Sequence, residues 1–283
     1  MDHSTWDADW SLLPGQATFD TQHIAAVSRT PNNLDLFVIG NDNHVWTNAW
    51  IHGNPNGGWD ADFHRLPGQA VFDRATQHIA AVLRTPNNLD VFVIGNDNHV
   101  WTNAWTHGNP DGGWDADFHR LPGQAVFDRA TQKVAVVSRA PGNLDLFAID
   151  KGSQVRTNAW TQGNPNGGWD ADFHQLPGVA LAVFDGATQH VVAVSRAPGN
   201  LDLFVAGAGE DNDHHIINDG SVWTIGWTQG DPNGGWKPDW SPLPGQRLFN
   251  LATQHVAAVS RTPANLELFV IGGGVWTRRW RQR

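Results

Sequence analysis

Short apolar segments of about seven residues recur along the chain, and each ends in a cluster of Gly, Pro, Asn or Asp. The first unit reads HIAAVSR before TPNN, LDLFVIG before GNDN, HVWTNAW before HGNPNGG, and WDADFHRL before PG. Segments of this length, rich in β-branched and aromatic residues and bounded by turn residues, are typical of β-strands. No stretch between two turns carries a sustained 3.6-residue period, so the pattern predicts an all-β chain without a substantial helix.

This four-segment unit is repeated five times. The pattern S/L-R-T/A-P-x-N-L-D/E-L/V-F recurs at intervals of 55, 55, 57 and 65 residues, and its arginines are Arg29, Arg84, Arg139, Arg196 and Arg261. Repeated four-stranded units of about 55 residues favour the antiparallel blades of a β-propeller. A β-solenoid has shorter coils, and a double sandwich needs no fivefold repeat. We therefore predict one five-bladed β-propeller domain over residues 1–283, with blades at about 22–66, 77–121, 132–177, 189–244, and 253–283 together with 1–14.

The fifth unit lacks its fourth segment at the C-terminus. The chain ends in GGGVWTRRWRQR, whereas WDADWSLLPG at 6–15 matches WDADFHRLPG at 59–68. In this alignment Trp6 corresponds to Trp59 and Trp10 to Phe63. We therefore predict that residues 6–13 form the fourth strand of the last blade and close the ring, which would also pair an exposed strand edge.

Charge and composition narrow the classes of function. The formal net charge of −10 argues against nucleic acid as the main partner. The chain contains no cysteine, which excludes a disulfide framework and thiolate chemistry. The sequence contains no apolar run of about 18 residues, so it predicts no membrane-spanning helix. The first ten residues, MDHSTWDADW, lack the basic start and the apolar segment of a signal peptide. Localisation stays open between the cytoplasm and a non-classical export route, as does homo-oligomerisation.

The aromatic and polar composition suits carbohydrate recognition. The chain has 16 Trp and no Tyr. A Trp ring packs against the C–H face of a sugar and carries an N–H donor, while Asn, Asp, Gln and His supply directional hydrogen bonds to hydroxyls. Most of the Trp residues are expected to pack between blades, namely the last Trp of each third segment (Trp50, Trp105, Trp160, Trp227, Trp280) and the first residue of each fourth segment (Trp59, Trp114, Trp169, Trp236, Trp6).

The Trp of the V-W-T motif is the candidate for stacking on a sugar, because the third unit has Arg156 in its place and a position that accepts this exchange is expected to reach solvent. In an up-and-down blade, the hairpin before this Trp shares a face with the link to the next blade. The predicted carbohydrate-binding residues are Asn41, Asp42, Asn43, His44, Trp46, Gln77 and His78, with Asn96, Asp97, Asn98, His99 and Trp101 in the second unit and Trp223 and Trp276 in later ones. The sequence GNDN is also typical of a tight hairpin turn without a role in binding. The opposite face, which carries RTPNN and HGNPNGG, is a second possible location for the sugar site.

Metal and catalytic motifs are weak. The segment EDNDHHIINDG resembles a Ca²⁺ loop in composition, but Ile216 stands where an EF-hand has Gly and Val222 where it has a bidentate Glu. The chain has no zinc-protease, nucleophile-elbow or P-loop motif. A glycosidase needs a carboxylate pair, and Glu210 and Glu267 are the only glutamates. We therefore predict no metal, no cofactor and no catalytic residue.

The sequence SRTPNNLDLFVIGNDNHVWTNAW at 28–50 resembles the signature of the Photorhabdus-type fucose-binding β-propeller lectins, and it recurs with drift through all five units. Those lectins commonly have seven blades, and in blade count the chain is similar to the tachylectin type. The resemblance implies a multivalent, non-catalytic lectin that binds fucose-like or N-acetyl monosaccharide units at clefts between blades. Its partners would be cell-surface glycans or polysaccharides. A protein-interaction scaffold and a glycoside-active enzyme are the alternatives.

Overall fold

The structure is a computed structural model. It describes residues 9, 11–15, 19, 23–55, 57–110, 112–165, 167–178, 182–184, 189–210, 216–231, 234–244, 256–263, 265–271 and 275–281. The regular elements in these ranges are all β-strands, in agreement with the all-β prediction. No helix in these ranges is long and apolar enough to cross a membrane.

The first three sheets repeat one antiparallel, four-stranded plan in which neighbours in sequence are neighbours in the sheet. The first sheet contains β1 (Ile24–Thr30), β2 (Asn33–Ile39), β3 (Val45–Ile51) and β4 (His64–Arg65). The second contains β5 (Ile79–Thr85), β6 (Asn88–Ile94), β7 (Val100–Thr106) and β8 (His119–Arg120). The third contains β9 (Ala135–Ala140), β10 (Asn143–Ile149), β11 (Val155–Thr161) and β12 (His174–Gln175).

The last two sheets vary this plan. The fourth contains β13 (Ala182–Val183), β14 (Val191–Ala197), β15 (Asn200–Glu210), β16 (Ile216–Thr228) and β17 (Ser241–Pro242). An insertion in the hairpin between β15 and β16 lengthens these two strands, and β13 pairs with the extension of β15. The fifth contains β18 (Val256–Thr262), β19 (Asn265–Ile271) and β20 (Val275–Arg281), so it has three strands within the described residues.

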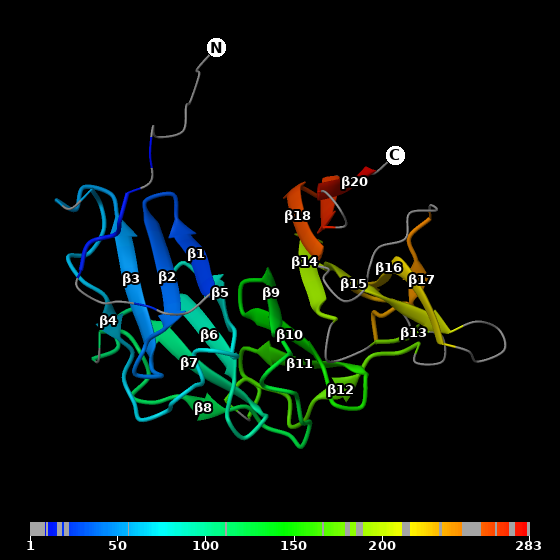
Figure 1. Cartoon of the computed structure of the whole chain (residues 1–283), viewed down its shortest axis with the longest axis horizontal. Coiled ribbons are helices and arrows are strands. Elements are labelled where there is room, and N and C mark those ends of the chain that lie inside the picture. The colour runs from blue at the N-terminus through cyan, green and yellow to red at the C-terminus, as the bar shows by residue number, and fades with distance from the viewer. Residues whose placement is uncertain are drawn as a thin grey trace, which may run out of the picture.

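The five sheets follow one another along an arc, with the first strand of each sheet innermost (Figure 1). These inner strands contact one another in order, β1 with β5, β5 with β9, β9 with β14 and β14 with β18. Such a radial arrangement of sheets is that of a propeller. The structure therefore has five separate sheets, whereas the predicted blade boundaries, including residues 1–14 in the fifth blade, stay a prediction.

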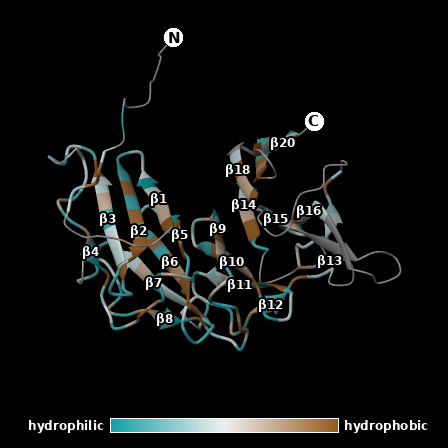
Figure 2. Cartoon of the chain, in the orientation of Figure 1, coloured by the Kyte–Doolittle hydropathy of each residue, from teal (hydrophilic) through white to brown (hydrophobic). Residues whose placement is uncertain are grey.

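The apolar core lies between neighbouring sheets. Phe37 and Ile39 of β2 pack with Ile79 of β5 and Val91 of β6 in one buried cluster. The second strands β6 and β10 are buried on both faces because each has a neighbouring sheet on either side, which explains their nearly continuous apolar sequences, LDVFVI and LDLFAI. Figure 2 shows this concentration of hydrophobic colour along β2 and β6.

The fourth strand is much shorter than the sequence pattern predicts. Residues 59–66 were expected to form it, but only His64 and Arg65 pair with β3, and Trp59 makes a single bridge to Trp50. Residues 61–63, between these points, are not in a strand. The fully buried Asn48 side chain donates hydrogen bonds to the main-chain oxygens of Asp60 and Asp62, so a side chain takes over part of the ladder.

The N-terminal link contacts the first sheet as each later link contacts the next sheet. A Cβ added to Gly15 would lie 2.5 Å from Asp62 Oδ1, and the same conflict occurs between Gly68 and Asp117. Both glycines have positive φ, which allows this close approach. Phe19 also meets Phe63 edge to face, as Phe72 meets Phe118 in the next unit.

The predicted closing strand, residues 6–13, lies partly outside the described residues. Residues 6–8 and 10 are not described, and the described residues 9 and 11–13 are not in a strand. The two ends of the row of sheets expose apolar side chains that are buried elsewhere. Ile24 of β1 is 63% exposed, against 8% for the equivalent Ile79, and Val275 of β20 is 74% exposed, against 1% for the equivalent Val45. Trp276 and Trp280 of β20 are each 40% exposed.

Candidate functional site

One arrangement of an arginine, an aspartate and a tryptophan recurs at four interfaces between neighbouring sheets. At the first, Arg29 Nε donates to Asp35 Oδ2 at 2.6 Å, and the guanidinium carbon lies 4.6 Å from the ring centroid of Trp105 in the next sheet. We call these interfaces the inter-sheet clefts. The second to fourth clefts have the same three residue types, Arg84, Asp90 and Trp160; Arg139, Asp145 and Trp227; and Arg196, Asp202 and Trp280.

A β-bulge orients the arginine. In the pairing of β1 with β2, the register shifts between Ser28 and Thr30, which leaves Arg29 without a partner in the ladder. The same shift brackets Arg84 in β5. Bulges commonly re-aim a side chain in this way. Here the side chain turns toward the aspartate of the second strand, which fixes the guanidinium against the tryptophan of the next sheet.

Two of these clefts enclose cavities at equivalent positions. The first cleft has a cavity of about 400 Å³ and the fourth one of about 480 Å³, both within the usual range for small-molecule pockets. The first is lined by Arg29, Asp35, Thr47, Asp60, His64, Arg65, Leu66, Pro67, Leu89 and Trp105, among others. The fourth is lined at the matching repeat positions by Arg196, Asp202, Thr224, Lys237, Ser241, Leu243, Pro244, Leu266 and Trp280. The repeat itself therefore builds the cavity.

Burial controls the charge of the cleft aspartates. Desolvation raises the pKa of Asp90 and of Asp145 to about 6, and it raises the pKa of Asp35 as well. The paired arginine acts in the opposite direction, but its effect is smaller than that of burial. At neutral pH the second and third clefts therefore present an ionised carboxylate, a guanidinium and an indole ring. This combination suits a small ligand with hydroxyl groups and one apolar face.

The predicted hairpin residues form self-contained turns. Asn43 and Asn98 have φ values of 63° and 64°, which the tight turns require. Asp42 Oδ1 accepts hydrogen bonds from the main-chain N–H of His44 and from Trp46 Nε1, at 3.1 and 2.9 Å. The second hairpin repeats these contacts with Asp97, His99 and Trp101. Much of the hydrogen-bonding capacity of Asp42 and Asp97 is thus used inside the turn.

The remaining predicted residues lie in several different places. Gln77 is fully buried and donates to Asn96 Oδ1 at 3.0 Å, while the ring of His78 contacts that of His23 at a tilt of 42°, with ring centroids 3.3 Å apart. Trp223 is buried in the core at 7% exposure, and Trp276 lies on β20. Asn41 contributes its main-chain oxygen to Arg74 at 3.4 Å. The structure brings Asp42, His44 and Trp46 together, and separately Gln77 and Asn96; a sugar site on this face stays a prediction.

The exchange of Trp for Arg156 in the third sheet has a structural explanation. Trp46 lies over Gly40, where an added Cβ would be 2.5 Å from its Nε1 atom. In the third sheet Asp150 occupies the position of Gly40, and its Oδ2 atom pairs with Arg156 Nε at 2.6 Å. An ion pair thus replaces an indole packed on glycine. The exchange therefore does not by itself require a solvent-facing position.

Replacing Arg156→Trp alone should destabilise the protein by about 3 kcal/mol, because it leaves the buried Asp150 unpaired and crowds the new ring. The triple variant Asp150→Gly/Gly152→Asp/Arg156→Trp restores the residues of the first two hairpins and should come within about 1 kcal/mol of the parent. Urea unfolding measures both values. Equal stability of the single variant and the parent would contradict the coupling.

The repeat arginines and aspartates were not among the predicted site residues. In the sequence these arginines mark the repeat, and the sequence pattern predicts that Trp105 and its equivalents pack between blades. The six-residue separation of Arg29 from Asp35, kept at Arg84, Arg139 and Arg196, was the signal available in the sequence. An arginine and an acidic residue recur at this spacing in two strands that are otherwise apolar, which indicates a buried polar site.

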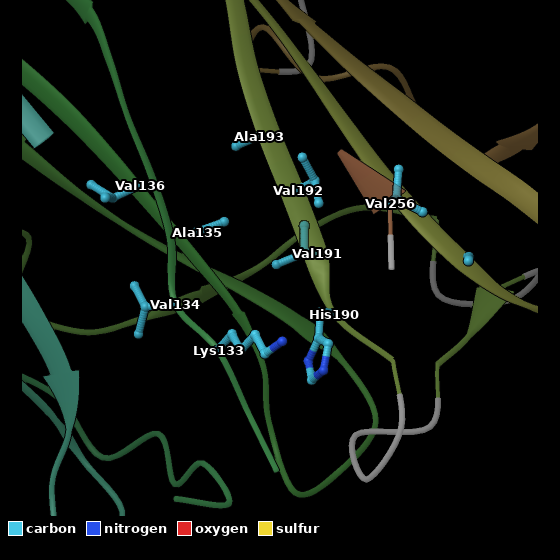
Figure 3. A pocket seen from close by; sticks show the side chains of 10 residues that line it. Lys133, Val134, Ala135, Val136, His190, Val191, Val192, Ala193 and Val256 are labelled. Atoms are coloured by element: carbon cyan, nitrogen blue, oxygen red, sulfur yellow. The ribbon is translucent and has the colours of Figure 1, made fainter. Parts of the chain in front are cut away.

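A further cavity, of about 280 Å³, lies beside the inner strands β9 and β14. Its walls are valine and alanine, and the side chains of Lys133 and His190 point toward one another at one end (Figure 3). Burial lowers the pKa of Lys133. The walls offer little hydrogen bonding to a hydroxylated ligand, so the inter-sheet clefts are the better candidate site.

Neither a family model nor a curated protein matches the chain. Among solved structures, the BP39L lectin from Burkholderia pseudomallei matches with a TM-score of 0.70 and 17% identity, over 94% of this chain and 69% of that one. The Aleuria aurantia lectin in complex with α-methyl-L-fucoside matches with a TM-score of 0.54 and 13% identity, over 94% and 80%. Another structure of that lectin, described as a six-bladed β-propeller, matches at 0.51 and 11%, over 92% and 74%. The chain therefore has the fold of the β-propeller lectins.

Proposed function

We propose that the protein is a multivalent, non-catalytic lectin that binds fucose-like or N-acetyl monosaccharide units in its inter-sheet clefts. The observation that carries the proposal is the recurrence of arginine, aspartate and tryptophan around a cavity. Two comparisons support it: the Aleuria aurantia lectin is described in complex with a fucoside, and AofleA from Arthrobotrys oligospora as a mutant with three evenly spaced arginines replaced. The signature at 28–50 favours the Photorhabdus type within this fold.

The geometry predicts weak binding at a single cleft. Stacking on one indole contributes ~0.5–1.5 kcal/mol, by analogy with aromatic pairs, and each hydrogen bond to the arginine or aspartate about 1 kcal/mol net. The sum corresponds to a dissociation constant on the order of 0.1–1 mM. Several clefts facing one glycan surface would raise the apparent affinity by about 10²–10⁴.

We also propose that residues 6–13 pair with β20 and close a five-bladed ring. The contacts of Gly15 and Phe19 with the first sheet support this, because each later link makes them just after a fourth strand. The exposed apolar residues at both ends of the row support it as well. Closure would create a fifth cleft from Arg261, Glu267 and Trp50, by analogy with Arg196, Asp202 and Trp280.

A glycan array followed by calorimetry tests the function. We expect binding to fucosylated or N-acetylated glycans, with a solution stoichiometry above one sugar per chain. A protein that binds no glycan on the array would end the lectin proposal and favour a protein-interaction scaffold. Hydrolysis of a bound glycoside would instead favour an enzyme.

Binding of a neutral sugar at the second and third clefts should fall about tenfold as the pH drops from 7.5 to 5. Asp90 and Asp145 take up protons near pH 6 and then no longer accept hydrogen bonds as carboxylates. Their folded-state pKa exceeds the unfolded value of 3.8, so protonation between pH 6 and 4 favours the folded state. Calorimetry should therefore show weaker binding at pH 5 than at pH 7.5, whereas thermal melts should show no loss of stability at pH 5 from these two aspartates. Binding that does not depend on pH would contradict the assignment of the sugar site to these clefts.

A further inference from the structure

The fourth cleft differs from the first in charge, although the two share their repeat positions. The charged residues that line the first cavity are balanced, with Arg29 and Arg65 against Asp35 and Asp60. In the fourth cavity Lys237 stands where the first has Asp60, and Ser241 where it has His64. Arg278 and Arg279 of β20 also line the fourth cavity, at positions occupied by Asn103 and Ala104 in β7.

The cations of the fourth cleft are only partly compensated. Arg196 pairs with Asp202, and Arg279 Nε pairs with Glu267 Oε1 at 2.6 Å. Arg278 donates a hydrogen bond to the main-chain oxygen of Pro244, which is uncharged. Among the described residues of this cleft, four cations therefore face two carboxylates, which leaves a net charge of +2 in a chain whose overall charge is −10.

Lys237 is placed to act on a ligand in this cavity. A Cβ added to Gly226, which lines the cavity, would lie 3.7 Å from Lys237 Cε and 3.8 Å from Asp202 Oδ1. The lysine stem therefore passes beside the Arg196–Asp202 pair. Arg278 and Arg279 approach from the neighbouring sheet, so the excess positive charge comes from both sides of the cleft.

We infer that the fourth cleft binds a saccharide that carries a sulfate or carboxylate group, whereas the first cleft binds a neutral sugar. The inference rests on the proposed lectin function and assigns a ligand class to one of its clefts. A guanidinium and an ammonium group bind oxyanions through charge-assisted hydrogen bonds, which are about twice as strong as neutral ones. Because the cations lie at an open cleft, this binding should weaken as ionic strength rises.

Titration with paired sugars tests the ligand class. The probes are N-acetylglucosamine and N-acetylglucosamine 6-sulfate, and methyl α-L-fucoside and methyl glucuronide. We expect one class of sites on the wild-type protein that binds a sulfated or carboxylated sugar at least tenfold more tightly than the neutral sugars and is sensitive to salt. The sulfate and the uronide arms distinguish the two anionic groups.

The repeat supplies the variants. Lys237→Asp/Arg278→Asn introduces the residues of the first unit, Asp60 and Asn48, and should abolish the preference for the anionic sugar while binding of neutral sugars at other clefts persists. Asp60→Lys should confer a preference for the anionic sugar on the first cleft. Lys151→Asp, a charge reversal in the β10–β11 hairpin, controls for added negative charge outside the fourth cleft, and Lys237→Ala is a milder variant if the double variant does not fold.

The outcomes separate this inference from the lectin proposal. An unchanged preference for the anionic sugar in a folded Lys237→Asp/Arg278→Asn variant, or in Lys237→Ala if only that variant folds, would overturn the assignment to the fourth cleft. Wild-type protein that binds neutral sugars at every site, without an anion-preferring class, would overturn the inference and leave the lectin proposal intact. Wild-type protein that binds none of the four sugars would overturn both.

Discussion

Removal of the arginine–aspartate pair from the first three clefts should reduce binding to a sugar-coated surface by roughly 10²–10⁴-fold. The variant replaces each arginine with Met and each aspartate with Asn, at Arg29 and Asp35, Arg84 and Asp90, and Arg139 and Asp145. Replacing both partners of a buried pair with groups of similar shape is often nearly neutral for stability, whereas removing one partner is costly. The protein should therefore stay folded while it loses its polar contacts to the sugar. Surface plasmon resonance on a glycan surface measures the loss.

The matched control moves the substitution to the hairpin face. Trp46→Ala/Trp101→Ala removes the indoles that were predicted to stack on a sugar, but it leaves the arginine–aspartate pairs in place. If the clefts bind the sugar, this variant should keep near-parental binding, and calorimetry should show an unchanged stoichiometry. Loss of surface binding in the folded hairpin variant, with full binding in the cleft variant, would place the site at the hairpins.

Deletion of residues 1–16 should lower the free energy of unfolding by about 3–6 kcal/mol, if residues 6–13 close the ring. The estimate takes about 1.5–3 kcal/mol for each of two large apolar side chains that closure would bury, such as Ile24 and Val275, whose equivalents Ile79 and Val45 are buried. For a chain of this size the melting temperature should fall by roughly 10 °C. The unpaired edge of β20 should also promote association. Deletion of residues 1–5 is the control, because it stops before Trp6.

A crosslink tests the register of the proposed strand directly. Trp46 pairs with Arg65 and Thr47 with His64 in the first sheet, so the repeat places Leu12 opposite Trp276 and Ser11 opposite Thr277. The chain has no cysteine, so Ser11→Cys/Thr277→Cys provides the only thiol pair. We expect an intramolecular disulfide under mild oxidation. The control Ser11→Cys/Arg278→Cys is one residue out of register and should form the disulfide poorly. Equal disulfide yields in the two variants would contradict closure of the ring. A melting temperature that the deletion of residues 1–16 leaves unchanged would also contradict it.

The strands and their order could be predicted from the sequence because the signals are local. Turn residues such as those of GNDN interrupt short apolar segments, and five repeats of one unit predict a radial arrangement of sheets. The fourth strand was predicted too long because the competing hydrogen bonds come from the buried side chain of Asn48. Nothing in the residues 59–66 themselves shows that an amide from another strand will replace part of their ladder.

The candidate site depends on contacts between units, which the local pattern does not contain. The spacing of Arg29 and Asp35 was visible in the sequence, but the position of Trp105 over the guanidinium follows from the packing of two sheets. In the same way, burial between sheets rather than residue type raises the pKa of Asp90 to about 6. The difference between Asp60 in the first unit and Lys237 in the fourth bears on ligand choice because both residues line equivalent cavities, which the sequence does not show. The sequence by itself determined the repeat and its strands, because turn and strand preferences are local. Only the tertiary structure decided which side chains meet across an interface, because desolvation and stacking arise only when two sheets pack together.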